Sequence, residues 1–187
     1  FAVARAAPIT IKQATTNPPL AMFQKDGNVF VLTADLVYRI ERTGAEVKVP
    51  AGFVTDFASV PGYAQSFISV LGKHSVPAIV HDFLYWEQTC TRAEADAILA
   101  EAMQEYESSW YQIQAVYWAV RAGAGDAWSE NTAERRKGLP RVIGKQALPV
   151  PVNMTWAEYR QKLFDGGMHA PPLAPGTPPP AYCKLPP

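Results

Sequence analysis

The stretch AIVHDFLYWE, residues 78–87, decides how this chain folds. Its apolar residues recur at helical spacing, and it follows Pro77, where the periodicity of the sequence changes. The chain before it has the composition of β-strands, and the chain after it has the pattern of helices. The segment therefore marks the boundary between a sheet and a helical layer.

Residues 28–60, upstream of this boundary, have the character of an antiparallel sheet. Three short runs are rich in β-branched and aromatic residues and are typical of strands: 29–32, 36–40 and 46–49. Thr43-Gly44 supplies the turn between the last two runs, and Pro50 ends the third. Residues 52–61 follow as a short strand that runs into a loop.

Helical patterns follow downstream of the boundary. Thr91 and Glu94 form a capping box, which predicts a helix that runs to about Glu107. A further helix is expected over residues 111–121, and a second capping box at Thr155 starts a short one. The sequence therefore predicts an α+β fold, in which a small N-terminal antiparallel sheet packs against a helical layer.

The chain divides into an N-terminal arm (1–27), a single α+β domain (28–167) and a proline-rich C-terminal tail (168–187). The sequence holds 17 prolines, and their concentration in the tail favours polyproline II over helix or central strand. We expect the tail to lie as a strap over the domain or to reach a protein partner.

Composition narrows the classes of function. The 187 residues carry 17 basic and 17 acidic side chains, so no positive excess can neutralise phosphates, and nucleic-acid binding is not expected. Hydrophobic residues make up 48%, and no run of about 18 apolar residues occurs, so we expect a soluble globular protein without a membrane span.

Two features bear on the cellular compartment. Residues 1–8 are either the remnant of an export signal peptide or a disordered N-terminal segment. Cys90 and Cys183 either form one disulfide or remain free thiols, because two cysteines do not establish an oxidising compartment. An exported, periplasmic or virion-associated location is favoured over the cytoplasm.

The residues with catalytic potential centre on His81. His81 and Tyr85 are four apart and share one helix face, and Asp82 is rotated by about 100° to the flank of that face. Asp96 lies one turn into the next helix, which should return antiparallel and bring its carboxylate to the imidazole. A carboxylate that accepts one imidazole N–H sets the tautomer and raises the basicity of the other nitrogen. We therefore expect a His81–Asp96 general base, with Tyr85 as a further hydrogen bonder.

Asp82 and Asp56 remain as spare carboxylates. With backbone carbonyls of residues 52–59 they are candidate ligands for a hard cation such as Ca²⁺, which takes oxygen ligands. Such a cation would stabilise negative charge that develops on a carbonyl or phosphoryl oxygen. Ser59 is a candidate nucleophile or hydrogen-bond donor. Zinc is not favoured, because no His or Cys ligand-spacing motif occurs.

Structural interpretations compete with these roles. In many proteins a His and a neighbouring Asp, such as His81 and Asp82, only satisfy each other's hydrogen bonds. Tyr85 is typical of an aromatic residue in the core. Asp96 lies four residues after Arg92, the spacing of an ordinary helical ion pair, and Asp56 is suited to cap a turn. The sequence has no Gly-rich phosphate loop, so nucleotide-driven chemistry is not indicated. It has no Gly-x-Ser-x-Gly elbow, so an ordinary serine hydrolase is not expected.

A family resemblance rests on two segments, VPAGFVTDFASVP (49–61) and AIVHDFLY (78–85). They carry the patterns GFxTDxASxP and HDxLY, and they resemble a domain-of-unknown-function family that is frequent in bacteriophage and prophage genomes, often among virion or lysis genes. The likeness covers about residues 28–130. It implies a shared site without naming the reaction.

A looser likeness is to the secreted phospholipases A2, whose catalytic helix reads His-Asp-x-x-Tyr and whose next helix supplies an Asp to the His. His81, Asp82, Tyr85 and Asp96 match that order. The likeness implies that the His activates water and that the following Asp binds Ca²⁺. The disulfide framework and the glycine-rich calcium loop of those enzymes are missing here.

Two functions follow from these patterns. The leading hypothesis is a hydrolase of bacterial envelope material, a phospholipid ester or a peptidoglycan amide, with His81 as general base. The alternative is a non-enzymatic phage virion or envelope structural protein, in which the His–Asp cluster joins two helices to the sheet. An inhibitor or immunity protein that binds through its tail is a third class without positive evidence. An accessible His81 would favour the enzyme, and burial of the cluster would favour the structural protein.

Overall fold

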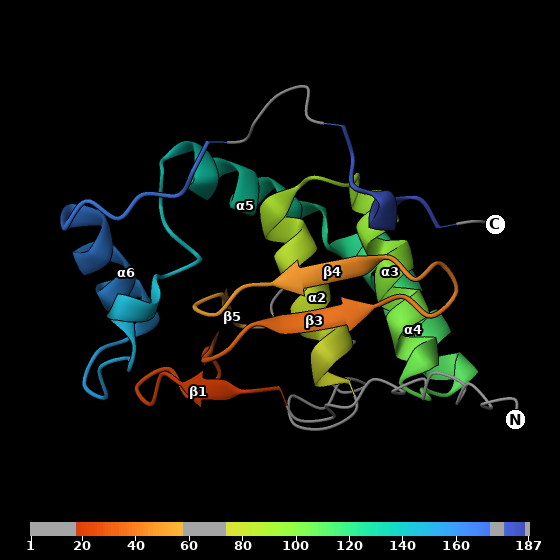
Figure 1. The fold of residues 1–187 in the computed structure, drawn as a ribbon, viewed down its shortest axis with the longest axis horizontal. Coiled ribbons are helices and arrows are strands. Elements are labelled where there is room, and N and C mark those ends of the chain that lie inside the picture. The colour runs from red at the N-terminus through yellow and green to blue at the C-terminus, as the bar shows by residue number, and fades with distance from the viewer. Residues whose placement is uncertain (1–17, 58–73, 173–177, 186–187) are drawn as a thin grey trace, which may run out of the picture.

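The structure is a computed structural model that describes residues 18–57, 74–172 and 178–185, and its α+β class is the predicted one (Figure 1). The strands of the described chain are β1 (Leu20–Met22), β2 (Phe30–Leu32), β3 (Leu36–Arg39), β4 (Glu46–Val49) and β5 (Val54–Thr55). The α-helices are α2 (Ser75–Glu87), α3 (Arg92–Glu105), α4 (Trp110–Gly123), α5 (Gly125–Arg136) and α6 (Trp156–Asp165). Two 3₁₀ turns complete the order, η1 (Lys145–Ala147) and η2 (Ala181–Cys183).

The strands form two small antiparallel sheets. The first has the order β1-β2-β5, and the second is the β3–β4 hairpin, in which Tyr38 lies opposite Val47. Both of these side chains are buried, while their strand neighbours Val37 and Lys48 are exposed. The buried and exposed side chains alternate along both strands, so one side of the hairpin faces the core.

The first sheet begins earlier in the chain than the sequence pattern indicated. β1 lies within the expected N-terminal arm, residues 1–27, and pairs with β2. Phe23, which follows β1, is completely buried. A strand of three residues is too short to show an alternation, so only its pairing partner reveals it.

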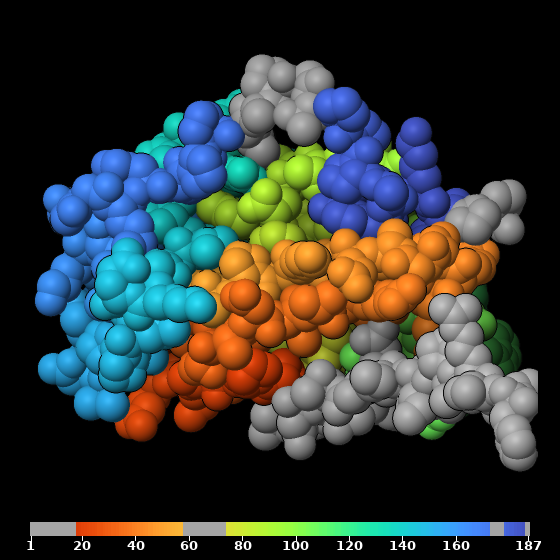
Figure 2. All heavy atoms as spheres, viewed as in Figure 1, coloured from red at the N-terminus to blue at the C-terminus, as the bar shows by residue number. Residues whose placement is uncertain are grey.

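Helix α2 is the centre of the molecule. Every residue from Ser75 to Trp86 is buried, because α2 packs against β4, β5, α3 and α5. A helix that is apolar nearly all round is stable only when it is enclosed in this way. Figure 2 shows the strands covering one side of the helices. The helix starts at Ser75, before the expected residue 78, because Pro77 lies in the first turn, where a backbone N–H is not needed.

The two capping boxes predicted from the sequence are both present. Thr91 and Glu94 cap α3, and Thr155 and Glu158 cap α6. In each, the threonine hydroxyl accepts from the glutamate backbone N–H and the glutamate carboxylate accepts from the threonine backbone N–H. Among the described residues, none of the helices combines the length and the apolar character needed to cross a membrane.

Helix α5 was not expected from the sequence. Its sequence, GDAWSENTAERR, has no apolar stripe. The helix docks instead through a few individual side chains. Trp128 packs edge-on against Tyr85 of α2, and the buried Arg135 Nη1 donates to the backbone carbonyls of Trp86 and Glu87 at the end of α2. Docking of this kind leaves no hydrophobic period in the sequence.

The proline-rich tail is described only in part. Its residues 178–185 are fixed to the helical layer, because Cys183 is bonded to Cys90 and the Tyr182 hydroxyl lies 3.3 Å from the Thr89 hydroxyl. The start of the tail is also attached, because the Pro171 carbonyl accepts from the Arg135 Nε atom. Residues 173–177 and 186–187 lie outside the described residues, so the strap remains a prediction.

Candidate functional site

His81 lies in the middle of α2, and its imidazole is completely buried. The short turn after Glu87 reverses the chain, so that α3 packs along α2 and presents Asp96 from its second turn. The His81 Nε2 atom lies 3.0 Å from the Asp96 Oδ1 atom, a hydrogen-bonding distance. The structure thus brings together the imidazole and the carboxylate that the sequence predicted to meet.

Tyr85 lies one helical turn after His81 and binds the same carboxylate. Its hydroxyl donates to Asp96 Oδ1 at 2.6 Å, and its ring centroid lies 4.2 Å from that of His81. Burial, and next the hydrogen bond to Asp96, raise the pKa of the Tyr85 phenol well above its ordinary value. Tyr85 therefore remains a protonated donor to Asp96.

Arg121, in the last turn of α4, is a contact of this cluster that the sequence analysis missed. Its Nη1 atom lies 3.6 Å from Asp96 Oδ2, and 34% of its side chain is exposed. The carboxylate is thus faced by His81, Tyr85 and a guanidinium, which stabilise its buried charge. One signal was available, because Arg121 is the only charged residue in α4. Arg92, the alternative partner of Asp96, instead donates to two backbone carbonyls at the end of α4.

The second ring nitrogen of His81, Nδ1, is buried and has no hydrogen-bond partner among the described residues. A buried polar atom is seldom left unpaired, because this costs about 1–3 kcal/mol. When Nε2–H donates to Asp96, Nδ1 carries the free lone pair, which is the tautomer that a general base requires. The cluster can therefore accept a proton from a group placed next to Nδ1.

Asp82 holds the loop that follows β5. Its Oδ2 atom accepts a short hydrogen bond from the Thr55 hydroxyl and another, of 3.0 Å, from the Phe57 backbone N–H. Phe57 has a left-handed backbone, with φ 57°, which residues other than glycine seldom adopt. The carboxylate therefore stabilises a turn that the chain would not adopt unaided.

The Asp56 carboxylate has a different partner from that of Asp82. Adjacent residues of an extended chain point to opposite sides, so Asp56 turns away while Thr55 reaches Asp82. The Asp56 Oδ1 atom lies 2.9 Å from the Arg141 Nη2 atom, in a partly exposed ion pair. This pair lines a cavity of about 180 Å³ between α5 and the start of α6, whose wall includes Trp156.

The predicted calcium ligands do not fit a shared cation site in this arrangement. Asp82 accepts two hydrogen bonds from the protein at one oxygen, and Asp56 is paired with the Arg141 guanidinium. Ca²⁺ takes six to eight oxygen ligands. In the described ranges, no cluster of three acidic, His or Cys ligands includes either aspartate. Ser59, the candidate nucleophile, lies outside the described residues.

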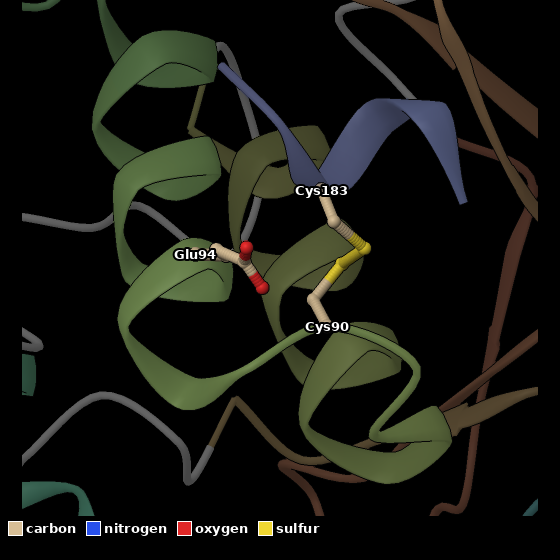
Figure 3. A group of neighbouring side chains, drawn as sticks. All are labelled: Cys90, Glu94 and Cys183. Carbon is tan, nitrogen blue, oxygen red and sulfur yellow. A yellow bond between two sulfur atoms is a disulfide. The ribbon is translucent and has the colours of Figure 1, made fainter. Parts of the chain in front are cut away.

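A cluster of three potential metal ligands does occur where the tail meets α3, at Cys90, Glu94 and Cys183 (Figure 3). The two cysteines form a disulfide, with their Cα atoms 5.3 Å apart. Glu94 is engaged in the capping box, where its Oε2 atom accepts from Thr91. Metals bind the thiolate form of cysteine, and disulfide-bonded cysteines have no thiolate. This cluster is therefore a covalent cross-link and not a metal site. The structure thereby decides between the disulfide and the free thiols that the sequence left open.

Comparison with known proteins bears on the segment that contains this cluster. Neither the curated proteins nor the solved structures give a match to the chain. One family model matches, and its segment runs from β2 to α4 and includes His81, Asp82, Tyr85 and Asp96. Over residues 30–120, the chain is thus similar to a family of uncharacterised domains, described as protein of unknown function (DUF1353).

Proposed function

We propose that this protein is a hydrolase of bacterial envelope material, acting on a phospholipid ester or a peptidoglycan amide, and that His81 is its general base. The observation that carries the proposal is the His81 ring itself. Its Nε2 atom is paired with Asp96 at 3.0 Å, while its Nδ1 atom has no hydrogen-bond partner among the described residues. A histidine that served only to join two helices would be expected to use both nitrogens.

In the proposed reaction, His81 Nδ1 accepts a proton from water while the water oxygen bonds to the carbonyl carbon of the ester or amide. The imidazolium then gives this proton to the leaving alcohol or amine as the C–O or C–N bond breaks. Asp96 stabilises the imidazolium, and Tyr85 fixes the orientation of the carboxylate by its hydrogen bond. Each of these steps uses side chains of the protein and does not require a cation.

The disulfide supports the location that this proposal requires. Disulfides persist in oxidising compartments and are rare in the cytosol, so the Cys90–Cys183 bond favours an exported, periplasmic or virion-associated protein. Such a protein meets envelope substrates directly. The resemblance of its two sequence patterns to phage and prophage proteins points to the same setting.

A second candidate function is favoured by burial. His81, Asp82, Tyr85 and Asp96 are each at most 1% exposed. In a non-enzymatic virion or envelope structural protein, this cluster would join α2, α3 and the loop after β5, and the proline-rich tail would reach the partner. The enzyme requires instead that the ring becomes accessible to its substrate, so the two functions predict different results for the same variants.

The deciding experiment compares His81→Ala with Tyr85→Phe. Hydrolysis of a soluble short-chain phospholipid and of peptidoglycan fragments is measured for the wild type and both variants. We expect the wild type to hydrolyse one of these substrates and His81→Ala to lose at least about 100-fold in rate. Tyr85→Phe removes one hydrogen bond from the same carboxylate and should retain most of the activity. Added imidazole should restore part of the His81→Ala rate, an effect that a structural histidine cannot produce.

The structural protein predicts another pattern. The wild type would hydrolyse neither substrate, and His81→Ala would lower the free energy of unfolding by about 1–3 kcal/mol, because Asp96 would lose a buried partner. Absence of turnover in the wild type, or an unchanged rate in His81→Ala, would remove the hydrolase proposal.

A further inference from the structure

Helix α4 presents an unusual group of aromatic side chains to solvent. Trp110, Tyr111 and Trp118 are 76%, 57% and 64% exposed. All the strongly exposed aromatic side chains in the described residues belong to this helix. We call these three residues the α4 ridge. Scattered exposed apolar residues are ordinary, but several large rings on one element mark a contact surface.

The ridge occupies one side of the helix. With 3.6 residues per turn, the three ridge residues fall within an arc of about 100°, and Gln114 and Arg121 lie within the same arc. The Trp118 indole N–H donates to the Gln114 side-chain oxygen at 3.2 Å, so the ring is oriented. The opposite side of α4 carries the buried residues and packs against α3 and α5 (Figure 1). The ridge is therefore not needed for the described core.

The charge of this surface indicates the partner. α4 has no carboxylate, and its single charged residue, Arg121, is partly exposed within the ridge arc. A helix face with indole and phenol rings, no carboxylate and one partly exposed guanidinium, which also contacts Asp96, complements an anionic phosphate headgroup. Trp and Tyr side chains prefer the headgroup level of membranes, because the ring is apolar and its N–H or O–H remains hydrated.

The size of the ridge argues against a stable protein partner. A Trp or Tyr side chain buries roughly 150–250 Å² when fully covered. Three rings that are about two-thirds exposed therefore offer roughly 300–500 Å² of contact area. Stable protein–protein interfaces bury about 800 Å² on each partner. A bilayer needs only a few such rings inserted at its surface, together with electrostatic attraction to anionic lipids.

The position of the ridge relates it to the candidate site. Arg121 lies in the ridge arc and also contacts Asp96, the carboxylate that binds His81. We propose that the α4 ridge docks the protein on the surface of an anionic phospholipid bilayer. If the proposed hydrolase function holds, on which this step rests, the substrate is the phospholipid ester rather than the peptidoglycan amide.

The test measures binding directly. The full-length oxidised protein is sedimented with vesicles of equal parts phosphatidylglycerol and phosphatidylethanolamine. We expect the wild type to bind and Trp110→Ser/Trp118→Ser to lose at least about tenfold in partition coefficient. The matched control is Val37→Ser/Val152→Ser, which removes two exposed apolar side chains outside α4 and should bind like the wild type. His81→Ala should also bind like the wild type, because it leaves the ridge intact.

Two results would overturn the docking proposal. The first is that the wild type does not sediment with the vesicles, whether or not it binds peptidoglycan sacculi. The other is equal vesicle binding by the ridge variant and the wild type. The docking and hydrolase proposals can fail separately. Vesicle binding without hydrolysis would contradict only the hydrolase proposal. Hydrolysis of a soluble ester without vesicle binding would contradict only the docking proposal.

Discussion

At the scale of single residues, Asp96 is the acceptor on which the buried polar cluster depends. It binds His81 and Tyr85 through one oxygen and faces Arg121 through the other. Removing a buried charge from water is costly unless other groups replace the solvent, and here two hydrogen-bonding side chains of α2 and the nearby Arg121 guanidinium do so. Asp82 likewise uses one carboxylate oxygen for two hydrogen bonds, from the Thr55 hydroxyl and from the backbone N–H of Phe57 in its left-handed turn.

Calcium is expected to leave the melting temperature unchanged. Asp82 is committed to protein donors and Asp56 to Arg141, so neither offers a free carboxylate to a shared ion. A ligand that binds only the folded protein must raise the melting temperature as its concentration increases. Thermal melts in calcium and in chelator make the comparison. A rise that disappears in Asp82→Asn would show that Asp82 binds the ion and would contradict its assignment to the loop.

At the scale of elements, α6 combines a capped first turn with partly buried aromatic contacts. Its residues are all at least partly exposed, although Trp156 and Tyr159 pack against Phe23. The Thr155 backbone N–H and then its hydroxyl hydrogen-bond the Glu158 carboxylate and lower its pKa below the ordinary 4.5. The ionised form of Glu158 is therefore favoured in the folded helix.

Acid should weaken this cap in the wild type and not in Glu158→Gln. A carboxyl whose pKa is lowered on folding adds stability above its unfolded pKa of 4.5, and this contribution is lost as the pH falls through the folded pKa. The melting temperature is compared between about pH 6 and about pH 3. We expect a smaller decrease in Glu158→Gln than in the wild type. Glu130→Gln, which changes an exposed glutamate of α5, is the matched control. Equal decreases in wild type and Glu158→Gln would show that the cap does not respond to acid.

At the scale of the whole molecule, two hydrophobic clusters share the first sheet. The larger surrounds α2 and includes Leu32 of β2, and the smaller lies under α6 and includes Val31 of the same strand. Alternating side chains of β2 therefore serve both clusters. The tail adds a covalent link, because Cys183 is bonded 93 residues away from Cys90.

Loss of the disulfide is expected to destabilise the whole fold. A cross-link that closes a loop of this length restricts the unfolded chain and contributes about 3–5 kcal/mol. Chemical denaturation of Cys90→Ser/Cys183→Ser and of the oxidised wild type measures the difference. A reducing agent should bring the wild type to the level of the variant and leave the variant unchanged. Equal stability of the variant and the oxidised protein would mean that the described tail adds nothing to the fold.

The sequence by itself determined the features that arise from near neighbours in the chain. Apolar periodicity predicted α2, and threonine–glutamate spacing predicted the starts of α3 and α6. Strand-forming residues on either side of the Thr43-Gly44 turn predicted the β3–β4 hairpin, and a spacing of four placed His81 and Tyr85 on one side of α2. These signals report interactions over two to four residues, which the chain makes wherever the element finally docks.

Only the tertiary structure decided the features that depend on docking. The pairing of β1, the docking of α5 on α2, the contact of Arg121 with Asp96 and the disulfide each join residues distant in the sequence. The pairing of Asp56 with Arg141 and the complete burial of His81 also depend on docking. No local pattern encodes such contacts, because they follow from which surfaces meet when the helices enclose α2.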